Sequence, residues 1–270
     1  MIDTSSTTAA PAVPSIAATA PARALGPLRR GAQLVLGLVA FAFSMAMLLH
    51  AGQGGMPWDV LHQGVVRTTG WSFGAVVALT SVLVLAAWVP LRQRPGVGTV
   101  ANIVIIAVAI EPSLFLLEAV WPQPEMFGQV VLALGGIVLN GVATAAYVGV
   151  RLGPGPRDGL MTGLVERTGW SVRSIKTGIE VAVVAVGWLL GGTVGWATVG
   201  FALGVGLVVQ AAARWRWLVP DGLAARSRPV RPTARRVPSV PPSDPAVRLR
   251  RRADQIGRAL DTLGEGARTS

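Results

Sequence analysis

Long apolar stretches alternate with short polar ones along most of the chain. No Asp, Glu, Lys or Arg occurs in residues 31–58, 68–91, 126–150 and 181–213. A helix that spans a membrane needs about 20 mainly apolar residues. Each stretch therefore holds one such helix, and the last has room for nearly two. With a further apolar segment before Trp121, the pattern predicts six transmembrane helices, over residues 31–50, 72–90, 98–119, 128–150, 172–191 and 195–214.

The overall composition agrees with a membrane protein. Of the 270 residues, 51% are hydrophobic and only 14% are charged, whereas about a quarter of the residues in soluble domains are charged. The chain has no cysteine, which excludes disulfides and thiolate metal sites. No His, Asp and Glu cluster has metal-ligand spacing and no nucleophile elbow is present. We therefore expect no metal, no cofactor and no enzymatic activity.

Positive residues gather in alternate loops of this six-helix arrangement. Cytoplasmic loops of membrane proteins are enriched in Lys and Arg, and the remaining connections hold a single arginine, Arg67, together with Glu118 and Glu125. Both termini are therefore expected to face the cytoplasm. The positive residues on that side are Arg23, Arg29, Arg30, Arg92, Arg94, Arg151, Arg157, Arg167, Arg173, Lys176, Arg214 and Arg216.

One stretch of the chain occurs twice, 99 residues apart. "PWDVLHQGVVRTTGWS" at 57–72 and "PRDGLMTGLVERTGWS" at 156–171 agree at nine of sixteen positions. The membrane region is therefore two copies of one unit, in residues 30–121 and 122–217, each with the order helix, polar segment, helix, helix. Further residues that the same shift aligns are Gly37 with Gly136, Ala46 with Ala145, Gly54 with Gly153, Gly96 with Gly195, Thr99 with Thr198 and Val100 with Val199.

The number of helices in each copy predicts how the copies are oriented. Three is odd, so the second copy must enter the membrane from the side opposite to the first, and the arginine distribution indicates the same. The predicted fold is an all-α polytopic membrane protein, with six transmembrane helices in two inverted three-helix repeats. Many secondary transporters have this arrangement and bind their substrate near the midplane between the repeats. Alternatively, duplication alone gives a stable pseudo-symmetric bundle with no transport role.

The duplicated polar segments are predicted to form short helices of about 10–12 residues, which lie on the membrane surface or re-enter it. Asp59 and Asp158 stand where the N-cap of each helix belongs, after a proline. They are either simple caps or a gate or ligand contact at each mouth of a pathway. Trp58 and Arg157 occupy matching positions, which makes them a prominent difference between the two copies.

Several polar residues lie within the predicted membrane helices. Charged side chains at the bilayer centre are costly and usually face the interior with a partner. Glu180 is either a proton or cation site or a structural ion pair with Lys176, one turn away, although Lys176 could instead reach the cytoplasmic edge. Glu111 and its counterpart Gln210 are further candidates for substrate contact, and Glu111 lies near the outer surface if its helix ends early. Asn140 is expected to hydrogen-bond between helices, and His50 and His62 to lie near the outer surface.

Polar segments flank the membrane region at both ends. Residues 1–29 are predicted to be a disordered cytoplasmic arm, 218–246 a disordered linker and 265–270 a disordered end. Between the last two, residues 247–264 are predicted to form a basic amphipathic helix. Because eleven of the 24 Lys and Arg residues lie between Arg226 and Arg268, we expect this tail to bind anionic lipid headgroups of the bilayer rather than nucleic acid. Contact with a partner or with a second copy of the chain is the alternative.

Three strings of residues resemble a known family. "LGPGPRDGLM" at 152–161, "GGMPWDVL" at 54–61 and "IEVAVVAVGWLLGG" at 179–192 are similar to the YczE/YyaS/YitT-type bacterial integral membrane proteins. The resemblance covers about residues 30–215 and implies a multi-pass protein of the bacterial inner membrane, in a family with little functional characterisation. It places Pro156, Arg157, Asp158, Gly159, Glu180, Gly191 and Gly192 among the motif residues without assigning them a chemistry. One departure is Ala197, where the family pattern has glycine.

Two functions are consistent with the sequence. The favoured one is a small secondary transporter, or permease, for an unidentified small solute or ion, with Glu180 and the pair Arg157 and Asp158 as its main polar contacts. The alternative is an accessory protein that does not transport and instead organises partners in the membrane. The candidate site residues are Asp158, Arg157, Glu180, Asp59, Trp58, Glu111, Gln210 and Lys176.

Overall fold

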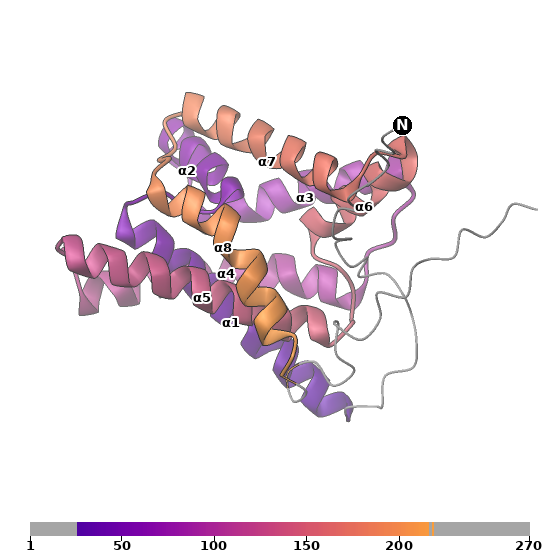
Figure 1. The fold of residues 1–270 in the computed structure, drawn as a ribbon, viewed down its shortest axis with the longest axis horizontal. Helices are drawn as coiled ribbons and strands as arrows, with labels where there is room; N and C mark the ends of the chain where they lie inside the picture. Colours follow the sequence, from indigo (N-terminus) through magenta and orange to yellow (C-terminus); the bar gives the residue numbers. More distant parts are fainter. Residues whose placement is uncertain (1–25, 216–217, 219–270) are drawn as a thin grey trace, which may run out of the picture. The chain divides into compact units, whose positions relative to one another are not determined.

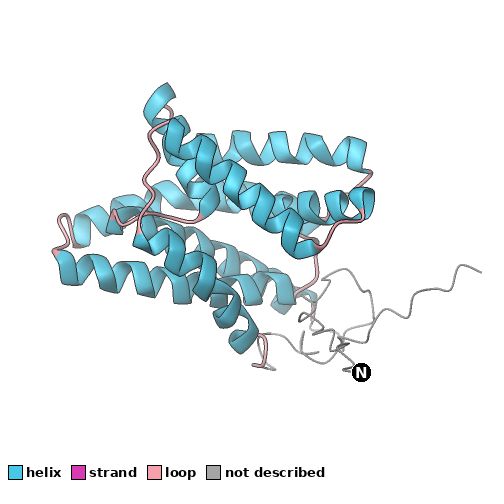
Figure 2. Ribbon diagram, turned by 45° about the horizontal axis from the view of Figure 1, so that its top comes forward, coloured by secondary structure: helices cyan, strands magenta, loops and turns pink. Residues whose placement is uncertain are grey.

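The computed structural model describes residues 26–215 and Leu218, and all regular structure in this part of the chain is helical (Figure 2). Figure 1 labels the eight helices. The predicted linker beyond Leu218, the amphipathic helix at 247–264 and the end at 265–270 lie outside the described residues, as does the arm up to residue 25. The helices are α1 (Pro27–Ala51), α2 (Pro57–Thr69), α3 (Phe73–Leu91), α4 (Val97–Val120), α5 (Met126–Gly149), α6 (Pro156–Thr168), α7 (Val172–Leu189) and α8 (Trp196–Ala212).

Each of the six long helices predicted from the sequence is present. Four of them, α1, α3, α4 and α5, are long and apolar enough to span a membrane. Helix α7 has 18 residues and carries Arg173, Lys176 and Glu180, and α8 has 17 residues. The all-helical membrane fold is therefore confirmed, whereas the number of spans stays a prediction. Helix α1 begins at Pro27, so the predicted arm ends before residue 29, because proline is well suited to the first turn of a helix.

Helix boundaries recur at the 99-residue spacing of the sequence repeat. Helices α5, α6, α7 and α8 each begin 99 residues after α1, α2, α3 and α4, respectively. The capping groups recur as well, because Ser72 accepts a hydrogen bond from the backbone N–H of Ala75 and Ser171 accepts one from that of Ser174. Repeated sequence thus gives repeated local structure, including a left-handed glycine after each short helix.

Contacts between the two copies are reciprocal. Gly37 of α1 packs on Tyr147 near the end of α5, and its counterpart Gly136 packs on Leu48 near the end of α1, so these helices are antiparallel. The backbone N–H of Gly98 donates to the carbonyl of Leu152 at 2.8 Å. At the equivalent place in the other copy, the backbone N–H of Ala197 donates to the carbonyl of Gln53 at 3.1 Å. Such paired contacts are those of an approximate twofold axis between the copies.

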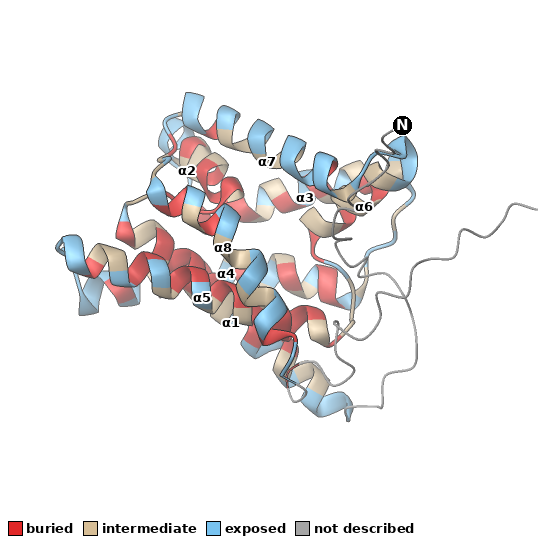
Figure 3. Ribbon diagram, viewed as in Figure 1, coloured by how far each residue is buried: buried red, intermediate tan, exposed pale blue. Residues whose placement is uncertain are grey.

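The main apolar core lies where α1, α4 and α5 pack together. Leu38, Met45 and Leu48 on α1 are fully buried against α5 residues such as Ala133. Figure 3 shows this buried interior, whereas α7 presents mainly exposed residues. Many large apolar side chains on the outer faces are exposed, among them Leu83, Val108 and Phe127. Such an outer surface suits a lipid environment, because exposing apolar side chains to hydrocarbon costs no free energy.

Candidate functional site

The short helices α2 and α6 begin deep in the protein. Each begins with proline at its first position, after Met56 and Gly155 as N-caps. Asp59 and Asp158 therefore occupy the third helical position, and the prediction that they are N-caps is wrong. Proline at the first turn, with its fixed φ and no N–H to satisfy, moves the helix start three residues earlier. An acidic side chain in the first turn still complements the positive end of the helix dipole.

The first turns of these two helices meet. The guanidinium carbon of Arg157 lies 5.0 Å from the centre of the Trp58 ring, within the range of a cation–π contact. This arrangement corrects the expectation of one polar contact at each mouth of a pathway, because the two helix starts form a single cluster. Counterparts in a twofold repeat can touch each other only near the axis, so the cluster lies on the approximate twofold axis.

Helix α2 contributes a buried acid and a buried imidazole. Asp59 and His62 are both fully inaccessible, and an oxygen of Asp59 lies 3.5 Å from Nδ1 of His62. That distance is longer than a normal hydrogen bond, and neither side chain has a hydrogen-bond partner among the described residues. Burial lowers the pKa of His62 below its ordinary value and the charge of Arg157 adds to this, whereas the neighbouring Asp59 opposes it. His62 therefore lies in the interior of the protein, and its expected place near the outer surface of the membrane stays a prediction.

Helix α6 contributes the counterpart acid in a different environment. Asp158 is half-buried, and its side chain hydrogen-bonds Tyr147 of α5 and the backbone of Gly155. Arg157 and Lys176 both act on Asp158 electrostatically. Asn102 of α4, which is 9% exposed, is a further polar residue of the cluster. Asp158 thus has hydrogen-bond partners and two cations near it, whereas Asp59 has the charge of Arg157 but no hydrogen-bond partner among the described residues.

Close packing fixes where each short helix lies. Gly159 of α6 lies against the indole of Trp88 on α3, whose Nε1 donates to the carbonyl of Pro156 at 2.9 Å. The reciprocal contact places Gly187 of α7 against the backbone of Val60 and Leu61 on α2. A Cβ at either glycine would overlap these atoms, so both positions need glycine for the helices to approach this closely.

The far ends of the short helices are held by separate groups. At the end of α2, Arg67 donates to the carbonyl of Gly191 and to the hydroxyl of Thr193. At the end of α6, Arg167 donates to the carbonyl of Pro90 at 2.6 Å, and Gln93 bonds Glu166 at 2.7 Å. In Figure 1, α2 and α6 lie toward opposite ends of α7. Each short helix therefore runs from the shared cluster to its own end of the bundle.

The other candidates from the sequence lie outside the cluster. Lys176 and Glu180 are paired at 3.8 Å, with side chains 53% and 31% exposed. Glu111 is exposed, and one of its oxygens accepts a hydrogen bond from the backbone N–H of Gly74 at 3.0 Å, at the start of α3. Gln210 is exposed on α8. Of these residues, only Lys176 acts on the cluster, through its charge on Asp158.

Sequence reasoning gave no role in the site to three polar residues of the cluster: His62, Tyr147 and Asn102. His62 was detectable as a histidine three residues after Asp59, a spacing that places both on one helix face. Tyr147 is the chain's single tyrosine, in an otherwise apolar helix. The expected interhelical hydrogen bond of Asn140 is confirmed, because it donates to Ser44 of α1 at 2.9 Å.

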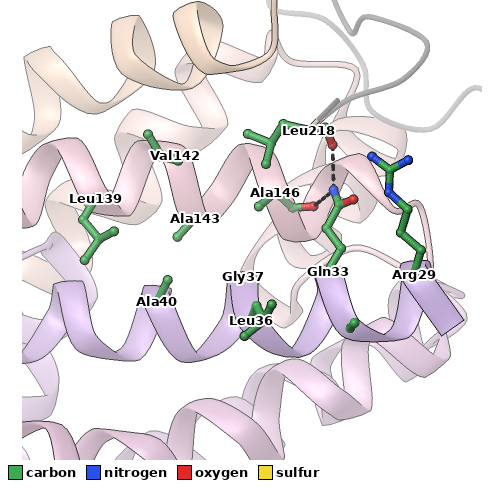
Figure 4. Close-up of a pocket in the computed structure, with 11 residues that line it drawn as sticks. Arg29, Gln33, Leu36, Gly37, Ala40, Leu139, Val142, Ala143, Ala146 and Leu218 are labelled. Carbon is green, nitrogen blue, oxygen red and sulfur yellow. Dashed lines mark hydrogen bonds between the residues drawn. The ribbon is translucent and has the colours of Figure 1, made fainter. Parts of the chain in front are cut away.

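A separate groove of about 340 Å³ lies between the two antiparallel helices α1 and α5 (Figure 4). Its walls are apolar, with Ala40, Leu139 and Ala143 along its length. At one end Gln33 donates to the carbonyls of Ala146 at 3.0 Å and Leu218 at 2.6 Å. None of the residues of the polar cluster lines this groove, so the two are independent features.

Comparisons with known proteins identify relatives without an assigned activity. A model of a family described as "Family of unknown function (DUF6198)" matches residues 28–214. An uncharacterized protein of Haemophilus influenzae is 37% identical over 180 residues, which is 65% of this chain and 81% of that protein. The uncharacterized membrane protein YczE of Bacillus subtilis is 31% identical over 182 residues, 64% of this chain and 80% of that protein. No solved structure matches. The resemblance to the YczE type is confirmed.

Proposed function

The chain belongs to the DUF6198 family of unknown function, and we propose that it is a small permease with a solute site between the first turns of α2 and α6. The observation that carries this proposal is the contact of Trp58 with Arg157 on the approximate twofold axis. Around it lie Asp59, Asp158 and Tyr147, from three helices. Ionisable groups inside a membrane protein are costly to keep and usually mark a substrate or ion pathway.

The proposal includes an inverted arrangement of two three-helix repeats in the inner membrane, with both termini in the cytoplasm. Reciprocal contacts and the antiparallel packing of α1 on α5 support it. The alternating distribution of Lys and Arg supports the orientation. In this arrangement α2 and α6 are half-helices that enter from opposite faces and meet near the midplane. Paired helix starts of this kind line the binding sites of several transporter folds.

The proposed solute site has a defined chemistry. It offers the guanidinium of Arg157, two carboxylates, the phenol of Tyr147 and an aromatic face at Trp58. Two helix starts add backbone dipoles with their positive ends toward the site. A small polar or charged solute satisfies these groups, whereas a large apolar one does not. Lys176 near the start of α7 is half-exposed and acts electrostatically on Asp158. It extends the polar path toward that end of the helix.

The proposal is tested by charge movement in reconstituted vesicles. The full chain in lipid vesicles, adsorbed on a supported membrane, is exposed to concentration jumps of monovalent ions, organic acids and amino acids. We expect a current for one class of solute, reduced about tenfold or more in Arg157→Gln and Asp158→Asn, because each change removes one charge of the cluster and a loss of about 1.4 kcal/mol of interaction is a tenfold effect. Glu118→Gln is the control, since Glu118 lies 65% exposed at the far end of α4. A protein that moves none of these solutes would contradict transport and favour the accessory role.

A further inference from the structure

The two counterpart aspartates of the polar cluster have unequal partners. Asp158 is held by Tyr147, by the backbone of Gly155 and by the charges of Arg157 and Lys176. Asp59, at the matching position of the first copy, has no hydrogen-bond partner for either carboxylate oxygen among the described residues. Asp158 therefore has partners that fix its position, whereas Asp59 is buried without one, and a buried polar group in that state calls for an explanation.

The neighbour of Asp59 is also a proton acceptor. Both nitrogens of His62 lack a hydrogen-bond partner within the described part of the chain, and its Nδ1 lies 3.5 Å from Asp59. Buried polar groups are normally hydrogen-bonded, so four orphan atoms in one place call for a functional explanation. The second copy does not repeat this pair, because Met161 stands at the position equivalent to His62.

We propose that Asp59 and His62 form the proton-binding site of this permease, taking up one proton between them from one side of the membrane and releasing it to the other. The inference rests on the proposed function, and it adds a proton as the coupling ion. The exchanged proton resides on the carboxylate or on the imidazole, and no covalent bond of the protein is made or broken. In a pair this close, the proton belongs to the pair rather than to either residue.

The charged groups around Asp59 and His62 determine how strongly the pair binds a proton. On α2 itself these are Asp59 and His62, and on α6 they are Arg157 and Asp158, with Arg157 acting on both members of the pair. On α7, Gly187 packs against α2. The charge of Lys176 acts on Asp158 and reaches the pair only through that residue. Helix α3 presents the ring of Phe73, whose centre is 5.7 Å from that of His62, with Glu111 of α4 beside the next residue, Gly74.

A purely structural role for the pair accounts for less of the geometry. A buried ion pair is stabilising only when additional hydrogen bonds satisfy its remaining donors and acceptors, and those bonds are missing here. A structural pair would also be expected to recur in the second copy, where the acid is instead bound by Tyr147. The arrangement therefore fits a pair that changes its protonation state during a transport cycle.

The inference is tested by direct titration of the histidine. The chain has only two histidines, so the protein labelled with ¹³C-histidine gives two imidazole signals in detergent, and His50→Gln assigns them. We expect the His62 signal to titrate below its ordinary midpoint of about 6.5. In Asp59→Asn the midpoint should fall further, by about half a unit or more, because the carboxylate no longer stabilises the imidazolium. Glu118→Gln is the control, because Glu118 is 65% exposed at the far end of α4, and it should leave the His62 midpoint nearly unchanged.

Two results would overturn the inference: a His62 midpoint that Asp59→Asn does not move, or a His62 signal that does not titrate between about pH 4 and pH 9. The outcome is independent of transport, because it needs neither a solute nor a membrane gradient. If the titration behaves as expected and no solute moves in the vesicle assay, the proton site stands and the permease proposal fails. If solute moves and Asp59→Asn leaves the titration midpoint of His62 unchanged, the permease proposal stands and the proton site fails.

Discussion

The guanidinium of Arg157 lies over the ring of Trp58, at 5.0 Å, although the 99-residue repeat makes these residues counterparts. Counterparts meet only at the axis that relates two copies, so this contact marks the centre of the duplicated unit. If both copies still carried the same residue there, two arginines or two tryptophans would face each other. Because one copy carries tryptophan here and the other arginine, the two side chains attract each other and the site is asymmetric.

The first prediction concerns the energy of this contact. A double-mutant cycle of Trp58→Leu and Arg157→Gln should give a coupling free energy of about 0.5–2 kcal/mol, the range of a cation–π contact that is partly shielded from water. Reversible unfolding in a denaturing detergent measures it. A coupling indistinguishable from zero would mean that the two side chains do not interact in the folded protein.

The second prediction concerns the glycine that lets α2 approach α7. In Gly187→Ala, the new Cβ would lie 2.5 Å from backbone atoms of α2, and overpacking of this kind costs about 1–3 kcal/mol. The matched control is Gly178→Ala on the same helix, where no atom lies within 4 Å of the new Cβ. The control should be neutral or stabilising by up to about 1 kcal/mol, since alanine is the better helix former. Equal losses in the two variants would contradict the packing described for α2.

A third prediction separates the two interpretations of Glu180. The side chains of Lys176 and Glu180 are 53% and 31% exposed, and ion pairs that water reaches contribute only about 0–1 kcal/mol. Glu180→Gln should therefore leave the free energy of unfolding almost unchanged. A transport defect with normal stability would assign Glu180 to the pathway, whereas normal transport would leave it as a surface ion pair. A large loss of stability would contradict the exposed position.

The fourth prediction is the pH dependence of stability. Because burial lowers the pKa of His62 in the folded protein, the unfolded chain binds more protons there as the pH falls. Stability is then fully present above the unfolded pKa of about 6.5 and is lost as the pH falls toward the folded value. Thermal unfolding should show this loss in the wild type between about pH 7 and pH 5, and a weaker slope in His62→Gln. Identical slopes would show that His62 does not stay neutral in the folded state.

Much of the fold was predictable because its determinants are local. Uncharged runs set the long helices, and the six predicted ranges agree with the structure to within four residues. The repeat predicted matched short helices, which the structure has at Pro57–Thr69 and Pro156–Thr168. Helix formation in these segments depends on proline, serine and glycine signals that a sequence displays directly.

The site was less predictable because it depends on contacts between distant residues. The sequence shows that Trp58 and Arg157 correspond, but not that the loops before them turn back into the protein far enough for the two to meet. Tyr147 joins the site from the end of α5, a position that only the antiparallel packing on α1 determines. Glu111 lies outside the cluster, where it accepts a hydrogen bond from the backbone N–H of Gly74 at the start of α3, and its role in a pathway stays a prediction.

The proposed permease requires that α2 and α6 start together and end on opposite sides of the membrane. Thr69 and Thr168 are exposed counterparts at the two helix ends, and each hydroxyl donates to the carbonyl four residues earlier. Because the chain has no cysteine, single substitutions Thr69→Cys and Thr168→Cys can be probed with a membrane-impermeant thiol reagent in cells and in inverted vesicles. We predict labelling of residue 69 only from outside and of residue 168 only from the cytoplasmic side. Labelling of both from the same side would contradict the inverted arrangement and the shared site that follows from it.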